Sequence, residues 1–466
     1  MIEDSIEPRI HPPLDESFRP AVLVTRAIRE KVAKGGTPVA IGLQRSDTEF
    51  SRYETTVLSE GHPEFSASLR HAERIIKFLL WQRGGFRVYV GGPRAIGAYI
   101  RQCYASDGAR KFDYHFMGEQ VYERPFEVIS CSPEEVPAPR ESGQRLGRHL
   151  EGSRIGFDLG ASDRKVSAVV DGQVIFSEEV IWEPRVQTDP DYHLREIMTA
   201  LKTAAARLGR VDAIGGSSAG IYIDNHPMVA SLFRGIPKER FGEIKDLFSR
   251  IQRELNVPLV VINDGDVTAL AGSMSINDVG ILGIALGSSE AAGYVNMQGH
   301  IMGWLNELAF APIDYSPSAP PEEWSGDVGC GASYFSQQCV FRLALRAGIQ
   351  IPADISDAQK LRFVQDKLEE GHEGARKIWQ SMGVYLGYGL AHYADFYDIK
   401  HILILGRCTS GRGGDLLLEG ATQVWKVEFP ELLPRITLHL PDEQIRRVGQ
   451  SVAAASLPAL GHEEAA

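Results

Sequence analysis

Cysteine is scarce in this chain. Only five cysteines occur among 466 residues, and no two of them form a CxxC pair. An odd number of widely spaced thiols fits reduced, buried side chains better than a disulfide framework. The five are Cys103, Cys131, Cys330, Cys339 and Cys408.

Surplus positive charge and long apolar segments are also lacking. The 49 Lys and Arg residues are outnumbered by 61 Asp and Glu residues, which gives a formal net charge of -12. Nucleic acid is therefore not an expected partner, because binding it requires clustered cations that neutralise phosphates. No apolar run approaches the ~20 residues that span a bilayer. The acidic, proline-containing N-terminus does not resemble a signal peptide, so we expect a cytoplasmic protein with no membrane partner.

The composition is that of a globular protein, with 43% hydrophobic and 24% charged residues. A chain of this length predicts two or three domains. Residues 128–147 mix proline, serine, glycine and charge without apolar periodicity, which is typical of an exposed connection. We therefore predict an N-terminal α/β domain of unknown role with its linker over 1–147, and a second region over 148–466.

Apolar runs that end in glycine, serine or carboxylate predict strands throughout the chain. In the N-terminal domain they are 38–45 and 86–92, with a helix over 70–81. In the second region they are 154–160, 165–170, 174–182, 211–220, 258–264, 279–289 and 400–407, with helices over 193–209 and 415–427. Strands that alternate with helices predict a largely parallel sheet, which binds ligands beyond the carboxyl ends of its strands. The polar strand ends are expected to converge on one cleft.

A strand that ends in a carboxylate opens the second region. Asp158 is followed by Gly160 and Ser162 in a tight turn, and Lys165 begins the next strand. Backbone amides in such a turn can face a phosphate while the carboxylate holds hydrated magnesium. The alternative for this stretch is a plain β-turn.

A later strand ends in Asn263 and Asp264, and a small-residue helix follows it. A carboxylate in this position can act as general base on an attacking hydroxyl. The alternative is an Asn-Asp turn that only caps the helix.

Further turns with small residues follow along the chain. One strand leads into Gly287, Ser288 and Ser289, and Glu307 lies in the loop beyond the next hairpin. Near the C-terminus another strand leads into Gly406 and the glycine-rich stretch 411–414.

In this order, the motifs from Arg154 onward resemble those of the ROK family of sugar kinases over about two thirds of the chain. The resemblance implies an α/β, actin-like (ribonuclease H-like) two-lobed fold with an extra N-terminal α/β domain. It implies ATP- and Mg²⁺-dependent phosphorylation of a sugar or sugar-like polyol. It also favours a homodimer.

The resemblance assigns roles to individual residues. Asp264 would be the general base, Asn263 and Glu307 would bind the sugar, and Asp158 would hold Mg²⁺ through water. The other matched positions would bind nucleotide or phosphate: Gly160, Ser162, Lys165, Gly287, Ser288, Ser289 and Gly406.

Two stretches depart from the family pattern. Glu290 follows the phosphate turn, where a carboxylate about 4 Å from a phosphate would cost ~4 kcal/mol in repulsion. It must point away, bind a cation, or mark a site that does not take ATP. In the loop that holds zinc in the family, Ala309 and Phe310 replace one ligand pair and only Cys330 matches a ligand position. We therefore expect no zinc, with Trp324 packing the loop instead.

The sugar pocket is also altered, since Ala332 stands where the family often carries a second glutamate. Asn306 beside Glu307 can supply a replacement hydrogen bond, and the alternative is an exposed loop asparagine. Two functions stay open: a kinase, or a non-catalytic kinase-like sensor or regulatory protein. A hydrolase with Asp158 as nucleophile ranks below both, because it would leave the Asn263-Asp264 pair without a role. The N-terminal domain lacks a basic recognition helix, so the second function is predicted without a DNA-binding domain.

Overall fold

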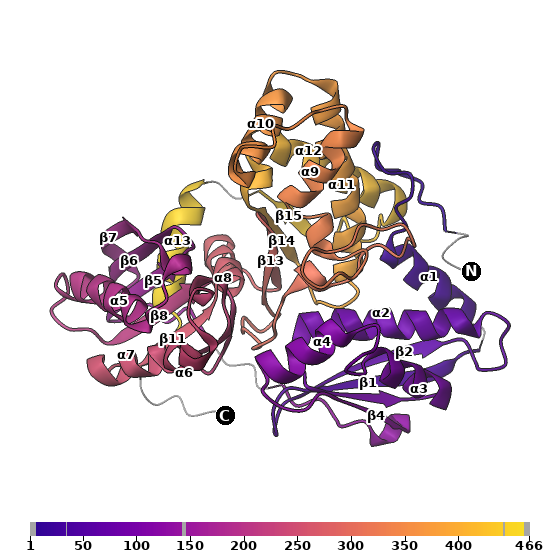
Figure 1. Cartoon of the computed structure of the whole chain (residues 1–466), viewed down its shortest axis with the longest axis horizontal. Helices are drawn as coiled ribbons and strands as arrows, with labels where there is room; N and C mark the ends of the chain where they lie inside the picture. Colours follow the sequence, from indigo (N-terminus) through magenta and orange to yellow (C-terminus); the bar gives the residue numbers. More distant parts are fainter. Residues whose placement is uncertain (1–5, 34, 142–145, 441–442, 461–466) are drawn as a thin grey trace. The chain divides into compact units, whose positions relative to one another are not determined.

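The computed structural model describes residues 6–33, 35–141, 146–440 and 443–460 (Figure 1). The chain forms two compact units, each assembled from separate segments. The first unit comprises Met1–Ser142, Ile284–Ala292 and Trp304–Leu440. The second comprises Gly143–Gly283, Gly293–Gly303 and Pro441–Ala466. The division at residue 147 into independent domains stays a prediction.

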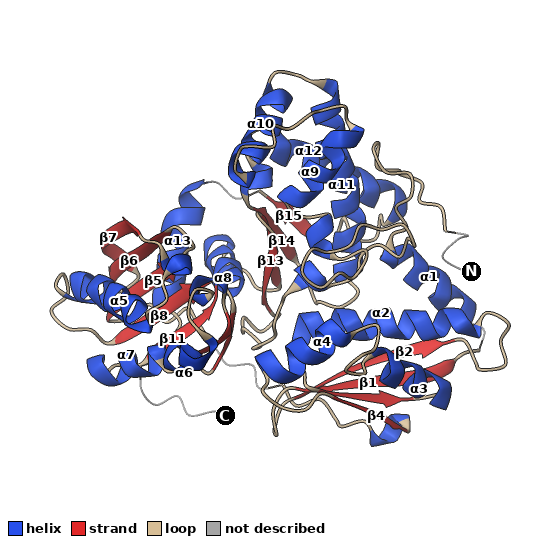
Figure 2. Ribbon diagram, in the orientation of Figure 1, coloured by secondary structure: helices blue, strands red, loops and turns tan. Residues whose placement is uncertain are grey.

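The N-terminal part of the first unit is a four-stranded sheet in the order β2-β1-β3-β4. Strand β1 pairs antiparallel with β2 and β3, and β3 pairs parallel with β4. Helix α2 lies along one face of this sheet (Figure 2). The predicted strands and helix are confirmed, and the helix extends further at both ends. The bounds are α1 Ala21–Val32, β1 Thr37–Gln44, β2 Phe50–Val57, α2 Phe65–Arg83, β3 Arg87–Gly91, α3 Arg94–Cys103, α4 Lys111–His115 and β4 Glu127–Cys131.

The prediction of an exposed connection over 128–147 is wrong at its beginning. Residues 128–131 belong to strand β4, which pairs with β3, and Val136 is buried. An edge strand is hydrogen-bonded on one side only, and this one is partly exposed along its length, so its sequence lacks the apolar alternation of a covered strand. Residues 142–145 of the predicted linker lie outside the described residues.

A second sheet, in the order β13-β12-β14-β15, contributes to the first unit. Helices α11 and α12 pack closely because Gly383 and Gly420 meet where a Cβ on either residue would overlap the other helix. The bounds are β12 Ile281–Leu286, β13 Glu290–Val295, α9 Gln337–Arg346, α10 Asp357–Glu369, α11 Glu373–Tyr393, β14 His401–Leu405, α12 Arg412–Glu428 and β15 Thr437–His439.

The second unit contains a five-stranded sheet in the order β11-β8-β5-β6-β7. Strands β5, β8 and β11 run parallel, and β6 and β7 form antiparallel hairpins after β5. Asp171 and Gly172 both have positive φ, as a two-residue turn between such strands requires. The bounds are β5 Ser153–Leu159, β6 Asp163–Val170, β7 Gln173–Ile181, α5 Pro190–Ala205, β8 Ala213–Ser218, α7 Leu247–Leu255, β11 Leu259–Asn263, α8 Asp264–Ile276 and α13 Glu443–Ala455.

Helix α13 lies directly on the sheet of the second unit. A Cβ on Gly156 of β5 would overlap the carbonyl of Ser451, and a Cβ on Gly215 of β8 would overlap that of Ala454. Only glycine permits this approach of helix backbone to strand backbone. The two glycines therefore bring the near-terminal helix against the strands that carry Asp158 and Ser217.

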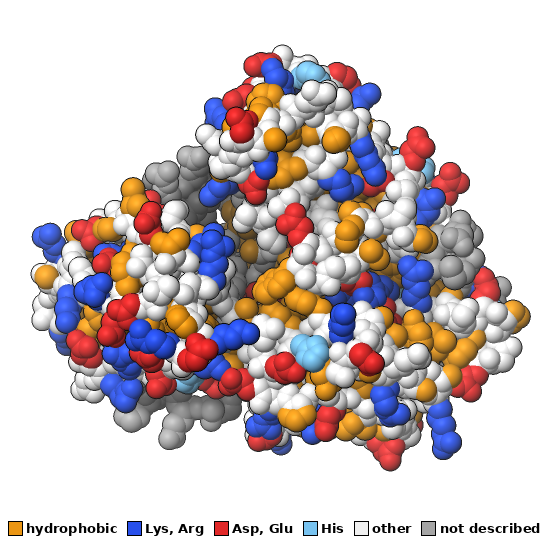
Figure 3. All heavy atoms as spheres, in the orientation of Figure 1, with side chains coloured by type: hydrophobic (Ala, Val, Ile, Leu, Met, Phe, Trp, Pro, Cys, Tyr) orange, Lys and Arg blue, Asp and Glu red, His pale blue; other side chains and the backbone are white. Residues whose placement is uncertain are grey.

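None of the helices that the structure describes is long and apolar enough to cross a membrane. On the face shown in Figure 3, Lys and Arg side chains are interspersed with Asp and Glu side chains.

Candidate active site

The carboxyl ends of three parallel strands carry the polar residues of the second unit. The pairing register places Asp158 of β5 beside Ser217 of β8, and Ser218 beside Asn263 of β11. The sheet therefore brings together Asp158 and Asn263, which are far apart in the sequence. Asp264 follows directly as the first residue of α8.

Asp158 accepts one hydrogen bond and lies near one cation. The Ser217 hydroxyl donates a hydrogen bond of 2.6 Å to Oδ1 of Asp158. Burial raises the pKa of Asp158, while that hydrogen bond and the positive charge of Lys165 oppose the rise. Lys165 itself forms an ion pair of 3.1 Å with Asp163. Lys165, a predicted phosphate ligand, therefore lies beside the carboxylates of Asp158 and Asp163 at this strand end.

The turn after β5 is closed by its own backbone. The Gly160 amide donates to the carbonyl of Asp163 at 2.9 Å, and the Trp182 indole donates to the Gly160 carbonyl at 2.8 Å. The Ser162 hydroxyl donates to Asp163 at 3.3 Å. Gly160 and Ser162 therefore lie in a tight hairpin turn beside Asp158, with the Gly160 amide engaged inside the turn.

Asn263 caps helix α8. Its Oδ1 accepts from the Gly265 amide at 2.7 Å, and its Nδ2 donates to the Gly220 carbonyl at 2.8 Å. The capping alternative is therefore present in the structure. An amide side chain has two donor hydrogens and two acceptor positions, so these bonds leave capacity for a ligand.

The surroundings of Asp264 strongly perturb its carboxyl group. Burial is the main reason that its pKa is raised to about 6, and the negative charge of Asp158 adds to the rise. The hydrogen bond from the Gly265 amide partly opposes it. A carboxyl with this pKa is mostly ionised at neutral pH and is a stronger base than an ordinary aspartate. The pair of Asp158 and Asp264 also fits hydrated Mg²⁺, which usually takes one or two carboxylates and keeps several waters.

A second group of predicted residues lies in the first unit. The Gly287 amide donates to the Ser289 carbonyl at 3.0 Å, and the Gly287 carbonyl accepts from the Gln337 amide at the start of α9 at 2.9 Å. Ser288 and Ser289 are exposed. Gly406 has φ +96°, and a Cβ there would overlap the backbone of Leu286. The predicted phosphate turn and the predicted nucleotide glycine are therefore neighbours.

Glu290 points into the first unit. Its side chain is 3% exposed, and its Oε1 accepts a hydrogen bond of 2.9 Å from the Tyr393 hydroxyl. A Cβ on Gly331 would overlap the other oxygen, Oε2. Burial raises the pKa of Glu290 to about 8, helped by the charge of Glu307 and opposed by the Tyr393 hydrogen bond. Of the three possibilities for this carboxylate, the structure supports the one in which it points away from the phosphate turn.

The loop that carries Asn306 and Glu307 also makes contacts within the first unit. Asn306 is only 4% exposed, and its Oδ1 accepts from the Tyr397 hydroxyl at 2.9 Å. The alternative of an exposed loop asparagine is therefore wrong, since a buried amide is kept by its hydrogen bonds. Glu307 is partly exposed and directly precedes a short 3₁₀ helix.

The loop around Cys330 is organised by buried charges. Lys77 of α2 contacts Asp113 at 2.9 Å and Asp327 at 3.3 Å, and Arg74 contacts Asp327 at 3.2 Å. Asp327 also pairs with Arg110, which contacts Glu73 at 2.6 Å. We call these six side chains the buried ion cluster: Glu73, Arg74, Lys77, Arg110, Asp113 and Asp327.

Residues at the loop that corresponds to the zinc loop of the ROK family do not fit a zinc ion. The Cys330 sulfur lies 3.7 Å from Asp327, and burial raises the pKa of the thiol far above its usual range, whereas zinc binds the thiolate. Two cations, Arg74 and Lys77, lie close to the same carboxylate. Trp324 packs against Phe310 with ring centroids 5.6 Å apart, as predicted. Within the described ranges, no group of three or more His, Cys, Asp or Glu side chains could hold a metal ion.

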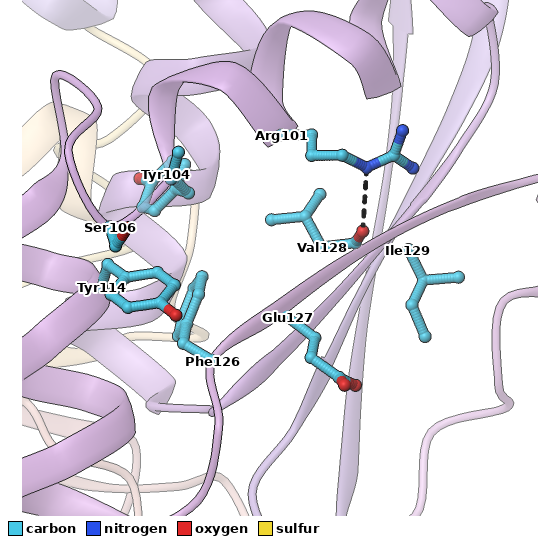
Figure 4. A pocket seen from close by; sticks show the side chains of 9 residues that line it. Arg101, Tyr104, Ser106, Tyr114, Phe126, Glu127, Val128 and Ile129 are labelled. Carbon is cyan, nitrogen blue, oxygen red and sulfur yellow. Dashed lines mark hydrogen bonds between the residues drawn. The ribbon is translucent and has the colours of Figure 1, made fainter.

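A pocket of about 560 Å³ lies elsewhere, between α3 and strand β4 of the N-terminal sheet (Figure 4). Arg101 donates to the Val128 carbonyl at 3.4 Å on one side, and Tyr114 and Phe126 lie on the other. None of the predicted site residues lines this pocket. It is separate from both groups of candidate residues.

No family model matches the sequence, and no curated protein matches it. Solved structures do. A hexokinase of the ROK family from Thermus thermophilus superposes with a TM-score of 0.50 at 15% identity, over 65% of this chain and 97% of that one. A ROK transcriptional regulator, a homologue of the E. coli MLC protein, superposes with a TM-score of 0.51 at 20% identity, over 66% of this chain and 79% of that one. The chain has the ROK fold.

The actin-like α/β architecture predicted from the motifs is therefore confirmed. Within the ROK fold, the second unit gathers Asp158, Asn263 and Asp264, and the first unit gathers Gly287 and Gly406. The likeness covers about two thirds of the chain, the share over which the motifs were found. Kinases and a regulator share this fold, so the residues must decide the activity.

Sequence reasoning missed several partners of the predicted residues. Ser217 and Ser218 end β8, and Tyr222 donates to Ser218 at 2.6 Å. The signal for the serines was present, since two of them follow two glycines at the end of an apolar strand. Tyr393 and Tyr397 carry no such signal, because their contacts with Glu290 and Asn306 join segments about 100 residues apart.

Proposed function

We propose that this protein is an ATP-dependent kinase that phosphorylates a hydroxyl group of a sugar or sugar-like polyol. The observation that carries the proposal is Asp264, a partly buried carboxyl with a pKa of about 6 at the start of α8, next to Asn263 and near Asp158. Phosphoryl transfer needs a base on the attacking hydroxyl, bound phosphates and a metal to balance charge. The likeness to a ROK hexokinase supports a sugar as the acceptor.

The resemblance to the ROK family implies the role of each residue, and the chemistry of its side chain is compatible with that role. Asp264 takes the proton from the attacking hydroxyl, and Asn263, Asn306 and Glu307 bind the sugar. Asp158, which accepts a hydrogen bond from Ser217, would hold Mg²⁺ through water. When bound, Mg²⁺ neutralises charge on the phosphates. The remaining proposed nucleotide and phosphate ligands are Gly160, Ser162, Lys165, Gly287, Ser288, Ser289 and Gly406.

The buried position of Glu290 is compatible with ATP binding. Its carboxyl group is buried beside Tyr393 and is mostly neutral at pH 7, because burial raises its pKa to about 8. A neutral, inward-directed group adds little repulsion to a bound phosphate. The turn of Gly287 to Ser289 can therefore accept phosphate without a charge penalty from this residue.

The test is ADP release from magnesium-ATP in the presence of D-glucose, D-mannose or N-acetylmannosamine, with equilibrium binding of magnesium-ATP measured in parallel. We expect nucleotide binding and sugar-dependent ADP release. If the protein does not bind magnesium-ATP at millimolar concentration, the kinase proposal is refuted.

The second candidate is a kinase-like sensor or regulator that binds a small molecule without turnover. The likeness to a ROK transcriptional regulator favours it. Sugar binding without ADP release would select this function. In either case we expect a cytoplasmic homodimer whose ligand is a small molecule, with neither nucleic acid nor membrane as a partner.

A further inference from the structure

The carboxyl end of helix α2 contacts the loop of the proposed sugar ligands directly. The last carbonyls of a helix have no partner within the helix and must find donors elsewhere. Here the Glu307 amide donates to the Trp81 carbonyl at 2.9 Å, and the Asn306 amide donates to the Gln82 carbonyl at 2.9 Å. Asn306 has φ +52°, a left-handed conformation. Two consecutive backbone amides of the loop thus cap the helix.

Trp304, at the beginning of the same loop, is held by the N-terminal region from two sides. The guanidinium of Arg83 lies over the indole ring, 4.9 Å from its centroid. The indole nitrogen donates to Glu141 at 3.0 Å, and Glu141 pairs with Arg45 at 2.8 Å. Each of these partners belongs to the first 141 residues, the part of the chain with no assigned role.

Helix α2 also contacts Phe310, at the far end of the loop. The Trp81 ring stacks on Phe310 with centroids 4.1 Å apart, and Gln82 donates to the Phe396 carbonyl at 2.9 Å. One turn earlier, Lys77 contacts Asp327 in the buried ion cluster. Within the first unit, the helix therefore contacts the loop at two backbone amides, those of Asn306 and Glu307, and at the rings of Trp304 and Phe310.

We propose that the N-terminal region is a structural part of the substrate site: the carboxyl end of α2, with Arg83, positions the loop of Asn306 and Glu307 and so sets the affinity for the sugar. This inference rests on the proposed function, because it takes these two residues as sugar ligands. Arg83 acts through Trp304 and is a positioning residue. In the described part of the chain, Arg83 contacts Arg52, Gln82 and Trp304 and does not contact the turn of Gly287, so nucleotide affinity should not depend on Arg83.

The test uses the full chain and the variants Arg83→Ala and Arg83→Lys, with Arg101→Ala as the matched control in the same N-terminal region. Removal of the cation from the indole should raise the sugar KM and Kd about threefold to thirtyfold. The KM for ATP should stay within about twofold of wild type. Arg83→Lys, which keeps a cation, should recover part of the loss, and Arg101→Ala should change neither constant.

Hydrogen exchange supplies a readout that does not depend on activity. In Arg83→Ala, the Asn306 and Glu307 amides should exchange faster, while the β6-β7 hairpin of the second unit should keep its wild-type rates. Wild-type sugar affinity and wild-type loop exchange in Arg83→Ala would overturn the inference while leaving the kinase proposal intact. A wild-type protein that binds no sugar in the panel would instead overturn the proposed function, and the inference with it. Sugar binding without ADP release would remove only the kinase step.

Discussion

The hydroxyl of Tyr393 donates a hydrogen bond of 2.9 Å to Oε1 of Glu290. This contact joins the first residue of β13 to the end of α11, and it directs the glutamate into the first unit. In the described part of the chain, the second oxygen of Glu290 has no hydrogen-bond partner. A buried carboxyl with one oxygen unsatisfied favours the protonated form. The residue that departs from the ROK pattern at the predicted phosphate turn is therefore a buried structural acid.

The first prediction follows from its titration. The pKa of Glu290 is about 8 in the folded protein, against an ordinary value of 4.5. Its contribution to stability is therefore present below pH 4.5 and is lost as the pH rises through 8. Glu290→Gln mimics the neutral acid. Over this pH range its free energy of unfolding should fall by roughly a few kcal/mol less than that of wild type. Thermal unfolding as a function of pH measures this, and parallel curves for the two proteins would contradict it.

Asp264→Asn should lower kcat by ~10² to 10⁴ and leave sugar affinity nearly unchanged, because the amide keeps the shape but cannot accept the proton. Single-turnover kinetics and sugar titration measure the two effects. Asp171→Asn, in the β6-β7 turn, is the matched control, since asparagine tolerates positive φ. Wild-type turnover in Asp264→Asn would show that the base is elsewhere.

The pH dependence of the reaction should report the same residue. Because the pKa of Asp264 is raised to about 6, kcat/KM should rise with pH and level off above that value as the carboxylate becomes available as base. Rates measured at saturating magnesium-ATP and constant ionic strength check this. A profile that is flat across pH 6 would exclude Asp264 as the titrating base.

Lys77→Met should destabilise the protein by about 3–5 kcal/mol, because it leaves Asp113 buried without its cation. Denaturant unfolding measures the loss. The double variant Lys77→Met with Asp113→Asn should recover part of it. Lys202→Met, which removes an exposed ion pair with Glu254, is the control and should cost at most about 1 kcal/mol. Equal losses for Lys77 and Lys202 would contradict the role of the buried ion cluster.

A chelator should not lower the unfolding temperature. The loop around Cys330 has one buried thiol and two neighbouring cations, Arg74 and Lys77, where a structural zinc site would need four ligands, usually thiolates and imidazoles. Thermal unfolding with and without EDTA tests this, together with the zinc content of the purified protein. Stoichiometric zinc, or a lower midpoint in EDTA, would show that the ion cluster does not organise the loop alone.

Periodicity and turn chemistry predicted most of the elements that carry candidate residues. Strands β5, β11 and β14 were predicted because apolar runs that end in glycine or a carboxylate are local signals. Strand β4 was missed because a short edge strand has a weak apolar pattern. The direction of Glu290 could not be predicted, since it depends on Tyr393 in a distant helix.

The sequence by itself determined the order of the motifs and hence the ROK fold, because strand and turn preferences act over a few residues. Tertiary structure alone decided which groups meet. The register of β5 and β8 joins Asp158 to Ser217, and packing of α2 joins Trp81 and Gln82 to the Asn306 loop. These contacts link segments from about 60 to more than 200 residues apart. They depend on burial and on the hydrogen-bond demands of helix and strand ends, which only the folded chain can satisfy.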